Sequence, residues 1–127
     1  MSYCFTTTLD KSFDDAIAHT TEALKEKGFG VLTTIDVRKT LKEKIDADFR
    51  PYTILGACNP NFAFQALQHE GKIGTMLPCN VIVEETDSGI EVSAIDPMAS
   101  MMAVENPDLA GIAGQVQALL KEVIETL

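Results

Sequence analysis

The C-terminal end of the chain carries the pattern that most constrains the fold. Its apolar residues recur every three or four positions and build one wide face, made of Leu109, Ile112, Ala113, Val116, Leu119, Leu120, Val123, Ile124 and Leu127. A helix with so wide an apolar face has to bury it against another layer of structure. We therefore expect a long C-terminal helix that packs on a sheet.

The rest of the chain supplies shorter helices and the strands of that sheet. Ser12 is a good N-cap for a helix that ends at Gly28, and Asn59 with Pro60 begins another that runs to His69. Thr40 is suited to cap a short helical turn over 41–45. Segments rich in β-branched and aromatic residues predict strands over residues 2–9, 29–37, 52–58, 81–85 and 89–95.

The resulting order, β-α-β-β-α-β-β-α, predicts an α+β fold in which an antiparallel sheet is packed on one face by helices. We expect one domain over residues 1–127. A sheet face that helices leave incompletely covered often finds a partner, so the pattern also predicts a homodimer.

Composition excludes several classes of function. Ten basic against nineteen acidic residues give a net charge of -9, which argues against binding to nucleic acid or to an anionic membrane. No apolar run approaches the roughly 20 residues of a membrane span. Three cysteines are an odd number and do not fit a disulfide framework, so we expect a soluble cytoplasmic protein.

Two cysteines stand in matching settings and form the candidate site. Cys58-Asn59 is followed by Pro60, and Cys79-Asn80 is preceded by Pro78. Cys58 lies where a strand gives way to a helix, and the helix dipole there favours a thiolate. If both motifs lie at the same end of the sheet, the two thiols can face each other.

Several interpretations of this pair remain open at the level of sequence. The thiols could form a reversible redox pair, or Asn59 and Asn80 could present amides to a small ligand. A soft metal could use Cys58 and Cys79 with His69 or Cys4, although the spacing matches no standard zinc motif. Free cysteine is also among the most buried residue types, so both cysteines could simply fill the core, with Asn59 acting only as a cap.

Other residues give weaker signals. His19 and His69 lie on polar sides of their helices, and Asp96 before Pro97 is typical of a turn. Residues 98–106 fit either a loop or a single helical turn. Met98, Met101 and Met102 in this segment could line an adaptable binding surface, although methionines are more often core or interface residues. There is no Gly-rich phosphate loop, nucleophile elbow or zinc-protease motif, so no catalytic residue and no cofactor are assigned.

Four motifs together resemble a known family. They are Lys27-Gly28-Phe29-Gly30-Val31-Leu32, Gly56-Ala57-Cys58-Asn59-Pro60, Leu77-Pro78-Cys79-Asn80-Val81 and Ala94-Ile95-Asp96-Pro97. In this order the chain, from Tyr3 to Leu127, is similar to domain-of-unknown-function family 302. The resemblance implies an α+β fold related to the TATA-binding-protein type, with a long C-terminal helix and a tendency to dimerise. It implies no activity and no DNA binding.

The sequence therefore predicts a small ligand or thiol site with Cys58, Asn59, Cys79 and Asn80 as its residues. One alternative is a non-enzymatic dimeric interaction module with structural buried cysteines, and another is a soft-metal-binding protein. Whether the protein is an enzyme is left open.

Overall fold

A computed structural model describes residues 2–127. Within these residues the chain forms five strands, five α-helices and one 3-10 turn. In order they are β1 (Cys4–Leu9), α1 (Phe13–Glu26), β2 (Gly30–Asp36), α2 (Val37–Ile45), β3 (Tyr52–Cys58), α3 (Pro60–His69), η1 (Ile73–Met76), β4 (Cys79–Thr86), β5 (Gly89–Ile95), α4 (Pro97–Ser100) and α5 (Asp108–Thr126).

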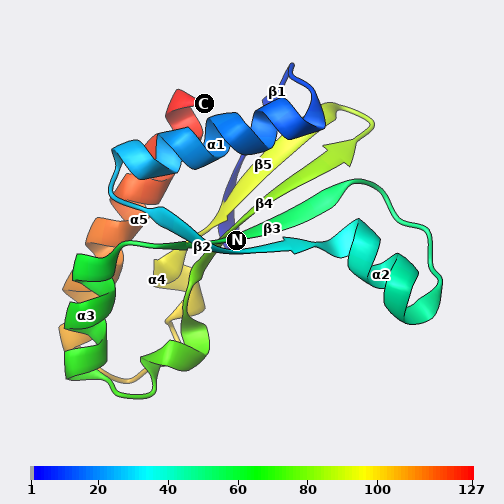
Figure 1. Ribbon diagram of the computed structural model, residues 1–127. Helices are drawn as coiled ribbons and strands as arrows, with labels where there is room; N and C mark the ends of the chain where they lie inside the picture. The colour runs from blue at the N-terminus through cyan, green and yellow to red at the C-terminus, as the bar shows by residue number, and fades with distance from the viewer. Residues whose placement is uncertain (1) are drawn as a thin grey trace.

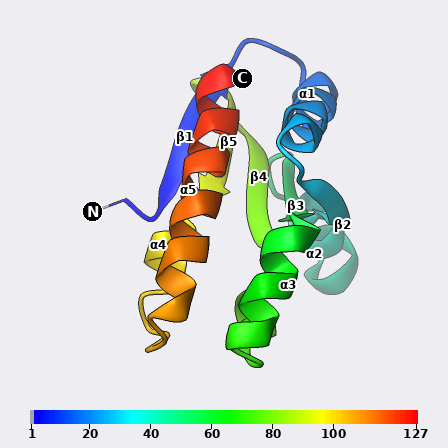
Figure 2. The ribbon, with the colours of Figure 1, turned by 90° about the vertical axis from the view of Figure 1, so that its left-hand side faces the viewer.

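The strands form one antiparallel sheet in the order β1-β5-β4-β3-β2. Figure 2 looks onto the helical face, where α5, α1 and α3 lie in front of the strands and α2 lies behind them. Figure 1 shows the same layers from the side, with α2 projecting away from the rest of the molecule. The predicted antiparallel sheet, with helices on one face and a long C-terminal helix, is confirmed.

Local signals in the sequence explain where the main helices begin and end. The Ser12 hydroxyl accepts a hydrogen bond from the backbone N–H of Asp15 at 3.2 Å, as its N-cap role requires. Gly28 follows this helix with φ +85, a conformation that glycine adopts without steric cost. The predicted boundaries of α1 are therefore confirmed. At the start of α5 the Asn106 side chain accepts a hydrogen bond from the backbone N–H of Asp108, but the N-cap position is Pro107, which makes no side-chain cap.

The core lies between the sheet and the pair α1 and α5. Side chains from every second position of the central strands are buried there, because alternate residues of a strand point to the same face. The largest fully buried side chains of this layer are Leu24, Phe29, Leu55, Val81, Val83, Val92, Leu120 and Val123.

Three segments differ in detail from the sequence prediction. The short helix begins at Val37 rather than near Leu41, because the Asp36 carboxylate accepts from the backbone N–H of Lys39 and caps it earlier. Residues 73–76, for which the sequence predicts neither a helix nor a strand, form the 3-10 turn η1. Within residues 98–106 the single helical turn α4 forms, and it begins one residue earlier at Pro97.

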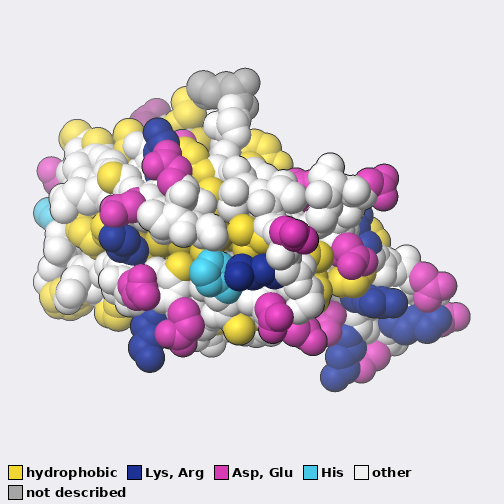
Figure 3. Space-filling view, turned by 90° about the horizontal axis from the view of Figure 1, so that it is seen from above, with side chains coloured by type: hydrophobic (Ala, Val, Ile, Leu, Met, Phe, Trp, Pro, Cys, Tyr) yellow, Lys and Arg dark blue, Asp and Glu magenta, His cyan; other side chains and the backbone are white. Residues whose placement is uncertain are grey.

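Surface charge and helix hydrophobicity bear on binding to nucleic acid and on crossing a membrane. On the face shown in Figure 3, acidic and basic side chains are interspersed and do not gather into one basic patch. None of the helices described in residues 2–127 has the length and apolar character needed to cross a bilayer.

Gly56 fixes how closely β2, β3 and β4 approach one another. A Cβ at this position would overlap the Thr33 hydroxyl on one side and lie 2.8 Å from Cγ of Pro78 on the other. Gly56 pairs with Thr33 in β2 and with Asn80 in β4. Only a residue without a side chain allows both neighbours this close, so Gly56 sets the position of Pro78 and of the strand that follows it.

We expect Gly56→Ala to lower the free energy of unfolding by roughly 1–3 kcal/mol, the usual cost of overpacking. Gly111→Ala is the matched control, because a Cβ there meets nothing within 4 Å and the position is an exposed site in α5. This control should be neutral or stabilising by up to about 1 kcal/mol. Urea unfolding measures both, and equal effects of the two substitutions would contradict this role of Gly56. Adding Thr33→Ala should recover part of the loss.

Candidate functional site

The two Cys-Asn motifs lie at the same end of the sheet. β3 ends at Cys58 and β4 begins at Cys79, and the register pairs Ala57 with Cys79. Because paired residues point to the same face, Cys79 faces the helices together with the fully buried Ala57. Cys58 is one residue further along, at the junction with α3.

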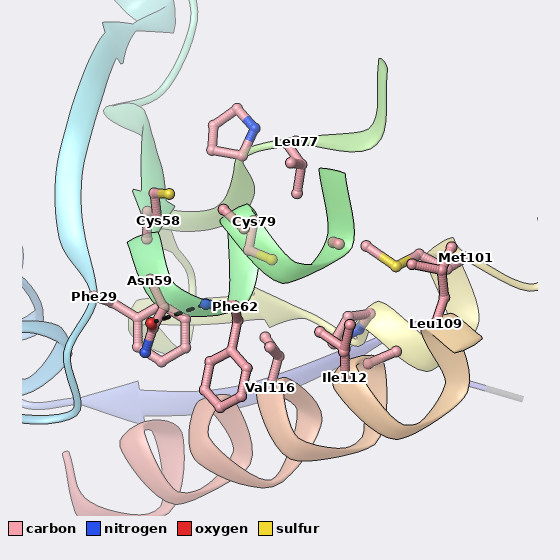
Figure 4. A pocket seen from close by; sticks show the side chains of 16 residues that line it. Phe29, Cys58, Asn59, Phe62, Leu77, Cys79, Met101, Leu109, Ile112 and Val116 are labelled. Carbon is pink, nitrogen blue, oxygen red and sulfur yellow. Dashed lines mark hydrogen bonds between the residues drawn. The ribbon is translucent and has the colours of Figure 1, made fainter. Parts of the chain in front are cut away.

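Both cysteines line an apolar cavity beyond the strand ends. Helices α3 and α5 form its sides, and α4 and the segment before β4 close it. In Figure 4 the Cys79 sulfur points toward the middle of this cavity, and Cys58 lies at one side of it. The largest side chains of the wall are Phe29, Phe62, Leu77, Met101, Leu109 and Ile112.

The cavity is small and carries no charged side chain in its wall. Its free volume is about 40 Å³, enough for a few water-sized groups and well below the several hundred Å³ of a drug-sized site. The polar groups in the wall are the two thiols and the Asn59 amide. A space of this chemistry favours a small uncharged guest over an ion.

Asn59 has a structural task at the edge of the cavity. Its carboxamide oxygen accepts a hydrogen bond from the backbone N–H of Phe62 at 3.5 Å and caps α3. Its amide nitrogen lies 3.0 Å from the place where a Cβ of Gly28 would stand. Asn59 therefore joins the start of α3 to the turn after α1, and so fixes the side of the cavity next to Phe29.

Asn80 lies outside the cavity. It pairs with Gly56, is exposed, and is absent from the cavity wall. Consecutive residues of a strand point to opposite faces, so the residue after Cys79 points away from the helices. The structure thus brings Cys58, Asn59 and Cys79 to one cavity and leaves Asn80 on the other face of the sheet.

Burial keeps both thiols protonated. Burial raises the pKa of Cys58 above its ordinary value, and it raises the pKa of Cys79 to about 11, with a smaller contribution from the nearby Cys58. The sequence suggested instead that the helix dipole would favour a Cys58 thiolate. Cys58 stands before the cap, and Pro60 at the first helical position offers no N–H, so desolvation dominates.

The two further residues considered as metal ligands lie elsewhere. Cys4 is in β1, three strands away from β3, and its sulfur is 3.9 Å from the Thr6 hydroxyl. His69 is at the far end of α3, where its Nδ1 lies 3.6 Å from the Asp108 carboxylate. Within residues 2–127 no group of three or more His, Cys, Asp or Glu side chains is placed to hold a metal ion.

Asp96 organises the closing segment of the cavity. Its carboxylate accepts a hydrogen bond from the backbone N–H of Met98 at 2.9 Å, which caps α4. It also accepts from the Gln117 side-chain amide at 3.0 and 3.1 Å. The predicted turn residue therefore also ties α4 to α5, and this places Pro97 and Met101 against the cavity.

Sequence reasoning assigned no site role to the residues of α5. Ile112 and Val116 line the cavity but have the pattern of ordinary core positions in the sequence. Met101, just after α4, was considered as part of an adaptable binding surface, and it does line the cavity. For α5 the available signal was the length of the C-terminal apolar face, which extends past the sheet. Its N-terminal turns pack with α3 and η1 through Leu109, Ala66 and Ile73.

Ionisation of Cys79 should make stability depend on pH above pH 9. The folded thiol, with its pKa raised from 9.0 to about 11, holds a proton that the unfolded thiol loses in this window. The folded state then binds more protons, so the free energy of unfolding falls as pH rises from about 9 to about 11, on the order of 2–3 kcal/mol for a shift of this size.

Urea unfolding of the wild type and of Cys79→Ala at several pH values tests this dependence. Cys79→Ala should be less stable at pH 7 but should lose the part of the alkaline slope that the thiol contributes. Val116→Ala shortens another side chain in the wall of the same cavity without removing a titrating group. This variant should therefore keep the wild-type dependence of stability on pH. Identical slopes for wild type and Cys79→Ala would show that the folded thiol ionises normally.

Comparison with known proteins gives a family and a fold. The chain is similar to a solved structure described as the crystal structure of uncharacterized conserved protein DUF302 from Bacillus stearothermophilus. The TM-score is 0.91 at 28% sequence identity, and the match covers 98% of each chain. No curated protein matches the chain. The family model described as domain of unknown function DUF302 matches residues 5–127, and the chain therefore belongs to the DUF302 family.

Proposed function

We propose that the protein binds a small uncharged ligand in the cavity at the strand ends, with Cys58, Asn59 and Cys79 in its wall. The observation that carries this proposal is a preformed apolar cavity, free of charged lining residues, into which a largely buried thiol points. Apolar pockets with a few convergent polar groups are the usual form of small-molecule sites.

The state of the thiols favours binding over thiol chemistry. A thiolate, not a thiol, attacks a disulfide or an electrophile, and burial raises the pKa of both Cys58 and Cys79. At neutral pH a ligand therefore meets two neutral S–H groups, which are weak donors and polarisable contacts. The proposed setting is the reducing cytoplasm, in which three free cysteines persist.

Occupation of the cavity by a short alcohol tests the proposal. At about pH 9, where a fraction of the Cys79 thiol is ionised, we expect 1-butanol to slow alkylation of Cys79 by iodoacetamide in the native protein, because the alcohol fills the space that the reagent needs to approach the sulfur. Mass spectrometry of the labelled peptides gives the rate at each cysteine. Cys4, in β1 and outside the cavity, serves as the internal reference.

A cavity-filling variant provides the control. Ala63→Leu enlarges a side chain in the cavity wall and should abolish the protection by 1-butanol. Ala118→Leu adds the same bulk at an exposed site on α5 outside the cavity and should keep the protection. Thermal unfolding of both variants verifies that they fold. If 1-butanol protects Cys79 equally in the Ala63→Leu variant, or does not protect it in the wild type, the cysteines are structural core residues and the ligand proposal fails.

A second candidate function is a dimeric interaction module, and a different surface supports it. Ile35, Ile54 and Ile82 are paired across β2, β3 and β4 and form one row on the sheet face opposite the helical core. Next to them Leu32, the extra residue of a β-bulge in β2, is 67% exposed, and Ile45 of α2 is 69% exposed. We propose that a second copy of the chain covers this outer apolar face.

The geometry of β2 and α2 fits such a homodimer. In the part of the chain that the structure describes, β2 pairs only with β3 and is an edge strand of the sheet, and α2 buries none of its residues. An isologous contact would cover the same edge and the same isoleucine row in both copies at once. It would also remove Leu32 and Ile45 from water.

Charge placed in the isoleucine row should separate the copies. We expect the wild type to have twice the 13.8 kDa chain mass in light scattering, and Ile35→Asp to have the mass of a single chain. Phe64→Asp is the matched control, because Phe64 is 63% exposed but lies on α3, away from this face. A single-chain mass for the wild type, or loss of the dimer with Phe64→Asp alone, would contradict the proposed interface.

A further inference from the structure

A second hollow lies next to the cysteine cavity. It is an open groove between the segment after α4 and the start of α5, with a free volume of about 500 Å³. Its own wall residues include Met98, Met102, Val104, Pro107 and Ala110. The cavity and the groove share three wall residues, Met101, Leu109 and Ala113, so the two spaces are neighbours separated by side chains.

Met101 is the adaptable part of this separation. Its backbone N–H donates to the Pro97 carbonyl at 3.0 Å, at the end of α4, so its backbone is fixed while its side chain stands between the spaces. Figure 4 shows the Met101 side chain at the edge of the cavity, facing the start of α5. A methionine has three rotatable side-chain bonds and a polarisable sulfur, so it can swing aside at low cost.

The walls of the two spaces define the chemistry of a guest that fills both. The cavity wall carries no charge, and the groove has one charged wall residue, Glu105, in a chain with a net charge of -9. The Asn106 side chain in the groove is already used by the His69 carbonyl and the Asp108 backbone N–H. The surroundings therefore favour an apolar guest and oppose a carboxylate, and the volume of the cavity, about 40 Å³, admits only a thin guest there.

We propose that the cavity and the groove form one elongated site for an uncharged linear aliphatic chain, which passes Met101 and ends beside Cys79. This inference rests on the proposed function, because it names the class of ligand for the same cavity. It adds that the site extends from the thiols to the methionines of the segment after α4. A short guest would fill only the inner part, and a long guest would fill both parts.

A series of linear alcohols from 1-butanol to 1-decanol, titrated calorimetrically into the full-length protein, tests the inference. Each methylene that leaves water should tighten binding by about fourfold until the groove is filled. Ala110→Trp obstructs the groove and leaves the inner cavity untouched, because Ala110 lines only the groove. This variant should bind 1-butanol like the wild type and lose the gain with chain length.

Two controls separate this site from general hydrophobic adsorption. Ala118→Trp carries the same bulk on the exposed side of α5 and should keep the full gain. Decanoate should bind at least tenfold more weakly than 1-decanol, since Glu105 and the net negative charge repel a carboxylate.

The outcomes distinguish this inference from the proposed function. If 1-butanol binds but longer alcohols bind no tighter, or if Ala110→Trp keeps the full gain, the elongated site is wrong and the cysteine cavity stands. If decanoate binds as tightly as 1-decanol, the assignment of an uncharged chain is wrong. If neither 1-butanol nor 1-decanol binds, the inference and the proposed function both fail.

Discussion

The antiparallel pairing of Ala57 with Cys79 is the contact on which the rest of the site depends. It brings the end of β3 and the start of β4 together, although 21 residues separate the two partners in the chain. Gly56 makes the pairing possible, because Thr33 and Pro78 occupy the space that any side chain there would need. A shift of one residue in this register would turn Cys79 to the outer face and Asn80 toward the helices.

The cavity arises because the helices continue where the sheet stops. α5 runs from the core over the sheet into a second small cluster with α3 and η1, in which Leu109, Ala66 and Ile73 are buried. Between the two clusters only the ends of β3 and β4 supply side chains from the sheet, and Phe62, Val116 and Cys79 line the remaining space. Two polar contacts hold the walls around it, the Asn59 cap at the start of α3 and the Asp96–Gln117 hydrogen bonds between α4 and α5.

The sequence predicted the architecture well because its strongest patterns are local. The apolar face of α5, the Ser12 cap and the hairpin around Gly89 each follow from neighbouring residues, and all of them are confirmed. The start of α2 was missed because Thr40 and Asp36 are both good caps and only the structure shows that Asp36 makes the hydrogen bond. The paired Cys-Asn motifs indicated the strand ends, but the position of Asn80 depends on the register, which the motif does not contain. The three methionines at 98, 101 and 102 indicated an adaptable surface, but the roles of Ile112 and Val116 come from tertiary packing and leave no mark on the local pattern.

The central claim is that the space beside Cys79 is a preformed cavity that admits a small uncharged guest. The most direct measurement is a crystal structure of the protein under xenon pressure, since xenon enters dry apolar cavities and is easily located by its electron density. The account predicts a xenon atom in contact with Cys79, Phe62 and Val116, with the surrounding helices in place. Absence of xenon from this position, with these side chains closed against one another, would contradict it.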